Sequence, residues 1–144
     1  MNRLGRVVID TSTLVGAALR VGSVPYQVLE LALSASDVRA CTSTMAELDT
    51  VLMRTKFDRY LPVDIRKAFV AMVRKQCSLF EVSAEDVANV SPACRDPKDN
   101  IFLALCLSCE ADVLVSSDAD LLALHPWHGI TIMMPAQFLQ AMSD

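Results

Sequence analysis

Glycine is scarce in this chain of 144 residues, with only four copies. Gly16 stands alone after the first apolar segment, so the glycine-rich loop of dinucleotide-binding and sugar-phosphate-binding proteins is absent at that position. No apolar run approaches the roughly 20 residues of a membrane-spanning helix. Asp10 interrupts the apolar stretch near the N-terminus too early for a signal peptide. We therefore expect a cytoplasmic protein.

Cysteine and histidine also lack the spacing of a known site. The five cysteines are an odd number without a disulfide-framework pattern. Cys106 and Cys109 have C-x-x-C spacing, but they fall inside an apolar helical pattern and no second pair completes a zinc site. We expect buried, reduced thiols. His125 and His128 lie in a loop with proline and tryptophan, where we expect a structural role.

The chain is long enough for one domain with a real core, and it is rich in apolar residues. Hydrophobic residues make up 53% of the sequence, and the mean hydropathy is +0.37. Strands of a parallel sheet are apolar on both faces, which accounts for part of this excess. The remainder is consistent with apolar surface reserved for a partner.

Short apolar segments alternate with helical patterns along the chain. The pattern predicts strands at 6–10, 38–41, 79–82, 112–116 and 130–133. Helices are predicted at 11–19, 25–34, 45–54 after the segment Thr42–Thr44, 62–76, 96–110, 118–124 and 135–142, with 85–94 as a connection. This alternation predicts a single α/β domain over residues 1–144. We expect three α/β/α layers around a mainly parallel sheet of about five strands.

Acidic residues recur where a predicted strand ends or a predicted helix starts. Asp10 and Asp118 follow strands, while Glu47 and the Asp96/Asp99 pair lie near helix starts. In an open parallel sheet these points share one edge, where ligands bind. Carboxylates gathered there would repel one another unless a cation joins them. A set of oxygen ligands without His or Cys suits Mg²⁺ or Mn²⁺.

Each acid also has a purely structural interpretation. Asp10, Asp96 and Asp118 could cap the helices that follow them. Residues Thr44–Glu47 fit the capping-box pattern, in which Glu47 would bond back to the Thr44 amide. Asp99 would favour the positive end of a helix dipole. The sequence alone leaves both interpretations open, because it does not show that the side chains converge.

The four acidic segments together resemble the PIN domain. The closest branch is that of VapC-type ribonucleases, the toxin components of bacterial toxin–antitoxin pairs. The resemblance runs from about Arg6 to Pro135 and rests on four pieces in a familiar order: Val8-Ile-Asp-Thr-Ser12, Glu47-Leu48 with Val51-Leu52, Asp96-Pro-Lys-Asp-Asn100, and Asp112–Asp118 with Asp120-Leu121-Leu122. The segment Arg54-Thr-Lys-Phe57 also resembles that branch.

The resemblance implies a parallel sheet flanked by helices and an acidic pocket that binds Mg²⁺ or Mn²⁺ and cuts single-stranded RNA. Carried over by position, the catalytic, metal-binding acids would be Asp10, Glu47, Asp99 and Asp118. The supporting residues would be Thr11, Ser12, Asp96, Ser117 and Asp120. Ser12 and Ser117 depart from the family, which often has Asn and Gly at these positions.

Basic residues concentrate in one stretch, although the net charge of the chain is −4. They would form either an ordinary solvated helix face or a basic flank beside an acidic pocket. In the second interpretation they hold the RNA backbone, and the candidates are Arg54, Lys56, Arg59, Arg66, Lys67 and Arg74. The apolar excess suggests a homodimer, and the toxin resemblance implies an antitoxin protein as partner.

The sequence leaves two other functions to compare with a nuclease. The first is a catalytically inactive RNA-binding or protein-interaction domain on the same fold, which fits if the acids merely cap helices. The second is a receiver-like phosphoacceptor domain, which needs an adjacent acid pair after the first strand. Asp10-Thr11-Ser12 does not supply that pair, so the sequence disfavours this function.

Overall fold

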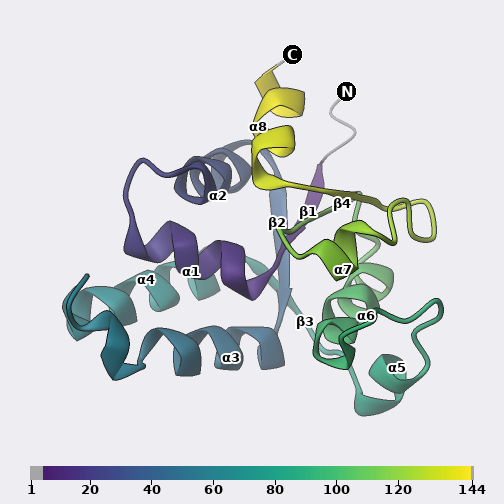
Figure 1. The fold of residues 1–144 in the computed structure, drawn as a ribbon, viewed down its shortest axis with the longest axis horizontal. Helices are drawn as coiled ribbons and strands as arrows, with labels where there is room; N and C mark the ends of the chain where they lie inside the picture. Colours follow the sequence, from purple (N-terminus) through teal and green to yellow (C-terminus); the bar gives the residue numbers. More distant parts are fainter. Residues whose placement is uncertain (1–4, 144) are drawn as a thin grey trace.

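The computed structural model describes residues 5–143, and a parallel sheet of five strands forms its centre (Figure 1). The strand order is β3-β2-β1-β4-β5. The strands are β1 (Arg6–Ile9), β2 (Asp37–Cys41), β3 (Ser78–Phe80), β4 (Val113–Val115) and β5 (Thr131–Met133). Every pairing is parallel, so all five strands end at the same edge.

The chain reverses its direction across the sheet beside β1. The first three strands are added on one side, where Val7 pairs with Val38. The chain then returns to place β4 on the other side, where Val7 pairs with Val113. Ligands of open α/β sheets bind in the crevice at such a switch point, beyond the carboxyl ends of the strands. Here the switch point lies beyond Ile9 and Val115.

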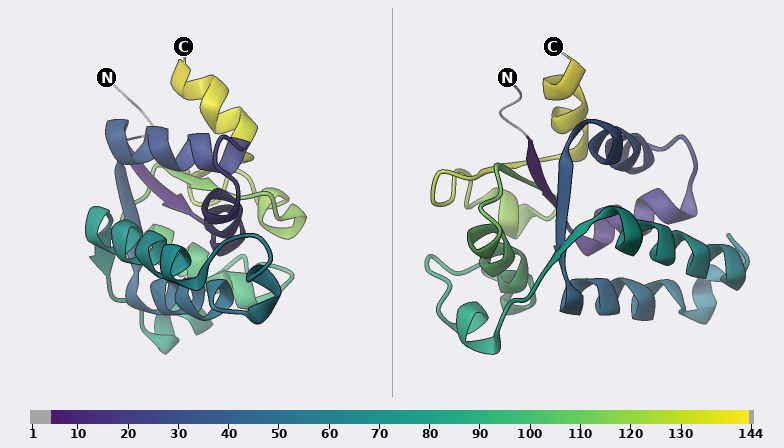
Figure 2. Two further views of the ribbon diagram at one scale, coloured as in Figure 1. Left: turned by 90° about the vertical axis from the view of Figure 1, so that its left-hand side faces the viewer. Right: turned by 180° about the vertical axis from the view of Figure 1, so that it is seen from behind.

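Helices cover both faces of the sheet, as the views in Figures 1 and 2 show. One face carries α1 (Thr11–Leu19), α2 (Val24–Ala35), α3 (Thr42–Leu52) and α4 (Val63–Gln76), with α8 (Pro135–Ser143) packed on α2. The other carries α5 (Ala84–Ala88), α6 (Asn100–Ser108) and α7 (Ala119–Leu122). Two short 3₁₀ helices are η1 (Thr55–Phe57) and η2 (Pro97–Asp99).

The sheet separates two apolar cores because side chains alternate along each strand. Val7 and Ile9 of β1 face the core under α1 to α4, whereas Val8 faces the core under α6. In β4, Leu114 likewise faces away from its two neighbours. Strands buried on both faces account for much of the high hydropathy. The predicted α/β class and parallel sheet are confirmed.

Three local predictions were wrong. Segment 85–94 is not only a connection, because it contains most of α5, which Ser83 caps. The helix predicted to begin at Asp96 begins as η2, and the α-helix proper starts at Asn100. On α4 the basic residues were expected to be exposed, but it is the apolar Ile65 that is 51% exposed. Arg66 is buried there instead, for a reason given below.

The residues expected to be structural make structural contacts. His125 Nδ1 accepts a hydrogen bond from the Ile132 amide at 2.9 Å, and His128 Nε2 lies 2.7 Å from the Ser91 carbonyl oxygen. All five cysteines lie in the described part of the chain and are free thiols, four of them buried. Burial raises the pKa of Cys77 to about 12, so this thiol is protonated at neutral pH. Within residues 5–143 no helix is long and apolar enough to cross a bilayer.

Replacing Leu114 by Ala tests the two-core arrangement. Leu114 is fully buried in the core under α6, so Leu114→Ala should lower the free energy of unfolding by about 2–5 kcal/mol. The matched control is Leu107→Ala on α6, where the side chain is 46% exposed and the loss should be less than about 0.5 kcal/mol. Urea unfolding measures the change in the free energy of unfolding for both variants. Equal losses would contradict the assignment of Leu114 to a core.

Candidate active site

Asp10 is fixed at the switch point between β1 and β4. It follows β1 directly, and its amide donates to the Val115 carbonyl at 3.1 Å. As the N-cap of α1, its Oδ1 accepts from the Thr13 amide at 3.0 Å. Its Oδ2 accepts the Ser116 hydroxyl at 2.6 Å. Only 4% of Asp10 is exposed, so this carboxylate has one well-defined position.

Ser116 connects Asp10 to Asp118. Its hydroxyl donates to Asp10 and accepts from the Asp118 amide at 2.9 Å. Ser116 is completely buried, whereas the predicted supporting residue Ser117 is exposed. Ser116 was not among the residues predicted for the site, whereas the supporting role of Ser117 stays a prediction. Both serines lie beyond the end of β4 at Val115, so the strand pattern of the sequence does not distinguish them.

Asp99 and Asp118 interact directly although both are acids. Asp118 caps α7, its Oδ1 accepting from the Asp120 amide at 2.8 Å, and it shares a side-chain hydrogen bond with Asp99. The pKa of Asp99 rises to about 6. The largest cause is partial burial, followed by the charge and the hydrogen bond of Asp118 and by the charges of Asp96 and Asp10. The structure thus gathers Asp10, Asp99 and Asp118 into one acidic cluster.

Glu47 joins this region through Thr11. It projects from α3, and its Oε1 accepts the Thr11 hydroxyl at 2.6 Å. Thr11 is the residue after Asp10, so Glu47 lies beside the first turn of α1. The capping-box interpretation of Glu47 is wrong, because α3 begins at Thr42 and its box is formed by Cys41 and Thr44.

The capping interpretation is correct for three acids. Asp10, Asp96 and Asp118 each accept a hydrogen bond from an amide near the start of the following helix. Asp99 is the N-cap of α6 by position, but its side chain makes no cap hydrogen bond. Glu47 and Asp99 are therefore acids for which helix capping gives no explanation.

The donor chemistry of the cluster fits a hard divalent cation. All the acids offer oxygen, the ligand that Mg²⁺ and Mn²⁺ prefer. Asp99 and Asp118 form a carboxyl pair in which the ionisation of one group makes the ionisation of the other less favourable. A bound cation would offset this repulsion between the two carboxylates. Among residues 5–143, however, no three Asp, Glu, His or Cys side chains are already arranged as the ligands of one ion.

The other predicted supporting residues lie around the cluster. The Ser12 hydroxyl is 3.5 Å from Asp10 Oδ1, and Ser12 is exposed at the start of α1. Asp120 contacts Asp118 through its backbone amide. Asp96 Oδ1 accepts from the Lys98 amide at 3.1 Å, which orders the η2 turn that leads to Asp99.

Arg66 does not belong to the exposed basic residues, and its prediction as an RNA contact is wrong. Its side chain is completely buried, and its guanidinium donates to backbone carbonyls and to Asp58. The remaining candidates are all exposed: Arg54, Lys56, Arg59, Lys67 and Arg74.

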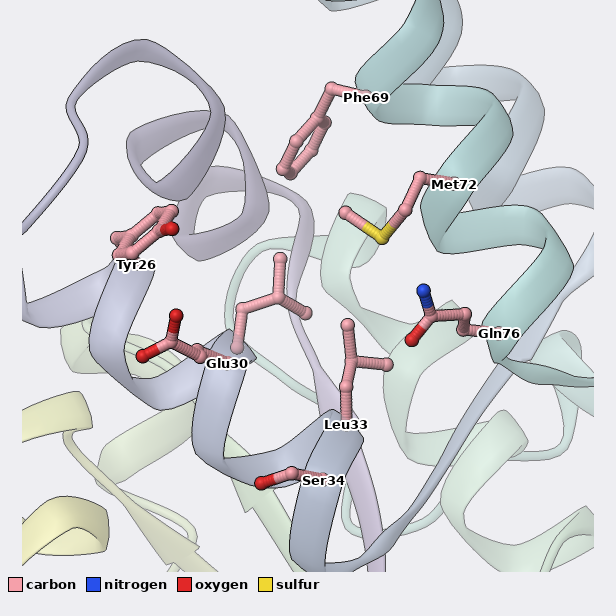
Figure 3. Close-up of a pocket in the computed structure, with 8 residues that line it drawn as sticks. Tyr26, Glu30, Leu33, Ser34, Phe69, Met72 and Gln76 are labelled. Carbon is pink, nitrogen blue, oxygen red and sulfur yellow. The ribbon is translucent and has the colours of Figure 1, made fainter.

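A groove lies away from the acidic cluster, between α2 and α4 (Figure 3). It has a volume of about 300 Å³. The side chains of Leu33, Phe69 and Met72 point into the space between the two helices. None of the clustered acids lines this groove, so it is separate from the acidic cluster.

Solved structures of the same fold were found in three organisms. PAE2754 from Pyrobaculum aerophilum is similar with a TM-score of 0.65 and 18% identity, covering 96% of both chains. VapBC2 from Rickettsia felis, bound to a DNA fragment from its promoter, is similar with a TM-score of 0.62 and 12% identity. The match covers 90% of this chain and 98% of that one. VapC20 of Mycobacterium tuberculosis, a sarcin–ricin loop cleaving toxin, is similar with a TM-score of 0.57 and 14% identity. The match covers 83% of this chain and 95% of that one. At these identities the similarity establishes the fold.

Sequence comparison identifies the family. No curated protein matches this chain significantly. The family profile described as PIN domain matches residues 6–120, which include β1, β4 and every acid of the cluster. The expected resemblance is confirmed, and the chain belongs to the PIN domain family.

Proposed function

We propose that this protein is a metal-dependent endoribonuclease that cuts single-stranded RNA and is the toxin of a toxin–antitoxin pair. The observation that carries the proposal is the acidic cluster of Asp10, Asp99 and Asp118 at the switch point of the sheet. Membership of the PIN domain family supports a nuclease. The similarity to VapC20, a toxin that cleaves the sarcin–ricin loop, supports RNA as the substrate.

Asp10, Glu47, Asp99 and Asp118 would hold Mg²⁺ or Mn²⁺, as one or two ions. Such an ion supplies an activated water and stabilises the leaving oxygen of a phosphodiester. Ser116 and the Thr13 amide orient Asp10, and the cap of α7 orients Asp118. Thr11 orients Glu47 through its hydroxyl. The exposed hydroxyl of Ser12 is placed to hydrogen-bond the substrate.

The proposed partners are an antitoxin protein and a second copy of the chain, in the cytoplasm. The similar VapBC2 structure is a complex that contains both components of such a pair. Exposed large apolar side chains, among them Val21, Val24 and Val63, provide surface for association.

An inactive RNA-binding or protein-interaction domain is the second candidate. It is favoured by the capping hydrogen bonds of Asp10, Asp96 and Asp118, which give these acids a structural use without metal. Cleavage and metal binding separate the two candidates.

The Asp10→Asn variant should lose RNA cleavage. Removing one carboxylate charge from the cluster weakens metal binding, so cleavage of a single-stranded RNA in Mg²⁺ or Mn²⁺ should fall at least about 100-fold. The matched control is Asp64→Asn, which removes an exposed carboxylate on α4 outside the cluster. Gel analysis of a labelled RNA, with and without chelator, gives the rates. Equal cleavage by wild type and Asp10→Asn would contradict the proposed site.

Manganese should stabilise the folded wild-type protein. A ligand that binds only the folded state at 100 times its dissociation constant adds about 2.7 kcal/mol, which corresponds to a rise in Tm of several degrees. Asp99→Asn should abolish most of this rise, whereas Asp64→Asn should keep it. Differential scanning fluorimetry with increasing Mn²⁺ measures the effect. A rise of equal size in Asp99→Asn would place the ion elsewhere.

Without metal, Asp99→Asn should instead stabilise the protein, by an amount that grows from about pH 4 and is complete above about pH 6. The pKa of Asp99 in the folded protein is about 6, against an ordinary value of 3.8, so ionising this carboxyl opposes folding increasingly between pH 4 and 6. A shift of about two units corresponds to about 3 kcal/mol. Solvent screening of this partly exposed side chain reduces that to about 1 kcal/mol.

Urea unfolding in chelator at pH 7.5 and pH 4.0 tests this effect of pH. The gain of about 1 kcal/mol should be present at pH 7.5 and absent at pH 4.0. Asp64→Asn serves as the control and should show no comparable gain at pH 7.5. A stabilisation by Asp99→Asn that is the same at both pH values would show that the pKa of Asp99 is not raised in the folded protein.

A further inference from the structure

The connection between α3 and α4 is folded around the buried guanidinium of Arg66. Its Nε donates to the Leu61 carbonyl at 2.9 Å. Its Nη1 donates to the carbonyls of Leu52 at 2.6 Å and Arg54 at 3.2 Å. Its Nη2 pairs with the Asp58 carboxylate. One side chain from α4 therefore contacts both ends and the middle of the segment Arg54–Leu61, called the clamp loop below.

Arg66 determines the shape of the clamp loop because its charge is completely desolvated. A buried charge is tolerated only when it is paired and its donors are satisfied. Here the guanidinium satisfies the carbonyl of Leu52, one of the last four of α3, which have no partner within the helix. Backbone bonds tighten the loop further, with Phe57 donating to Arg54 at 3.1 Å and Tyr60 to Phe57 at 3.0 Å.

The outer surface of the clamp loop combines cations with aromatic rings. Arg54, Lys56 and Arg59 are exposed, and Tyr60 is 62% exposed. The ammonium of Lys56 lies 5.1 Å from the centre of the Phe57 ring, and the Arg59 guanidinium lies 5.9 Å from that of Tyr60. Positive side chains that track a backbone, with an aromatic ring on which a base stacks, are the components of single-stranded nucleic acid sites.

The clamp loop is connected to the acidic cluster by α3. Glu47 lies on this helix five residues before Leu52, a distance of about 7.5 Å along the axis. The loop lies at the end of α3 away from the sheet, whereas the first residue of α3 follows β2 at the acidic edge (Figures 1 and 2). A strand that leaves the cluster along α3 therefore meets the loop.

We infer that the clamp loop is a preformed contact for single-stranded RNA, with Tyr60 as a base-stacking residue and Arg66 as the positioning residue that shapes it. The inference rests on the proposed nuclease function for the identity of the ligand. It gives Arg66 a role without RNA contact, and it adds Tyr60, which the charge pattern did not indicate.

Binding of a fluorescein-labelled oligouridine, measured by anisotropy in chelator, tests the role of Tyr60 without cleavage. Tyr60→Leu should raise the Kd at least about fivefold, and Tyr60→Trp should restore it because stacking needs only an aromatic face. The control Lys75→Gln removes a charge at the far end of α4 and should change the Kd less than about twofold. Equal affinity of wild type and Tyr60→Leu would overturn the assignment of Tyr60.

The role of Arg66 is tested with Arg66→Lys and with the milder Asp58→Asn. Lysine keeps the charge but cannot donate to four acceptors, so the Kd for oligouridine should rise about tenfold. Asp58→Asn changes only the exposed ion-pair partner of Arg66, and it should also raise the Kd for oligouridine. In cleavage assays both variants should raise KM and leave kcat within about twofold. Both should also keep the Mn²⁺-dependent rise in Tm.

Unchanged affinity and KM in Asp58→Asn and in folded Arg66→Lys would overturn the positioning role. Loss of the Mn²⁺ response together with affinity would also overturn it, because Arg66 would then support the whole fold. Failure of the proposed function gives a different result. A wild-type protein that binds oligouridine through Tyr60 but never cleaves RNA would contradict the nuclease proposal and support the clamp loop.

Discussion

Repulsion between carboxylates at one edge of the sheet is the constraint from which the rest of the site follows. Asp10, Asp99 and Asp118 come from three distant parts of the chain, and partial burial together with the charges of the neighbouring acids raises the pKa of Asp99 to about 6. A fold gains nothing in stability by placing like charges together. The surrounding hydrogen bonds therefore have to hold the acids in place, and the buried hydroxyl of Ser116 does this for two of them.

The scaffold opposes this repulsion with two rigid cores. β1 and β4 are neighbours in the sheet and are apolar on both faces, so the residues at their ends have little freedom. The helices that begin at this edge bring amides to Asp10 and Asp118. The same layout separates the negative cluster from the positive clamp loop, which lies at the opposite end of α3. In the proposed function, the clamp loop would hold an anionic RNA substrate and the acidic cluster would cleave it.

Much of this arrangement could be predicted from the sequence, because strand ends and helix starts carry local signals. Asp10 and Asp118 follow apolar strands, and their convergence follows from the parallel sheet. Arg66 shows where such prediction fails. Its spacing on α4 matches that of the buried Val70 and Val73, but a charged side chain is seldom fully buried, and only the tertiary contacts with a loop before α4 explain its burial. Ser116 and Ser117 are the same residue type and both follow the end of β4, so only the tertiary structure shows that Ser116 is buried and Ser117 is exposed.

The central claim is that the acidic cluster is a binding site for a divalent ion. The most direct test is a crystal structure of the protein soaked with Mn²⁺, with anomalous diffraction locating the metal. The account predicts an anomalous peak at about 2.1–2.2 Å from carboxylate oxygens of at least two of Asp10, Asp99 and Asp118. Asp10 still bonded to Ser116 and Asp99 still bonded to Asp118, with no peak between them at saturating Mn²⁺, would contradict it.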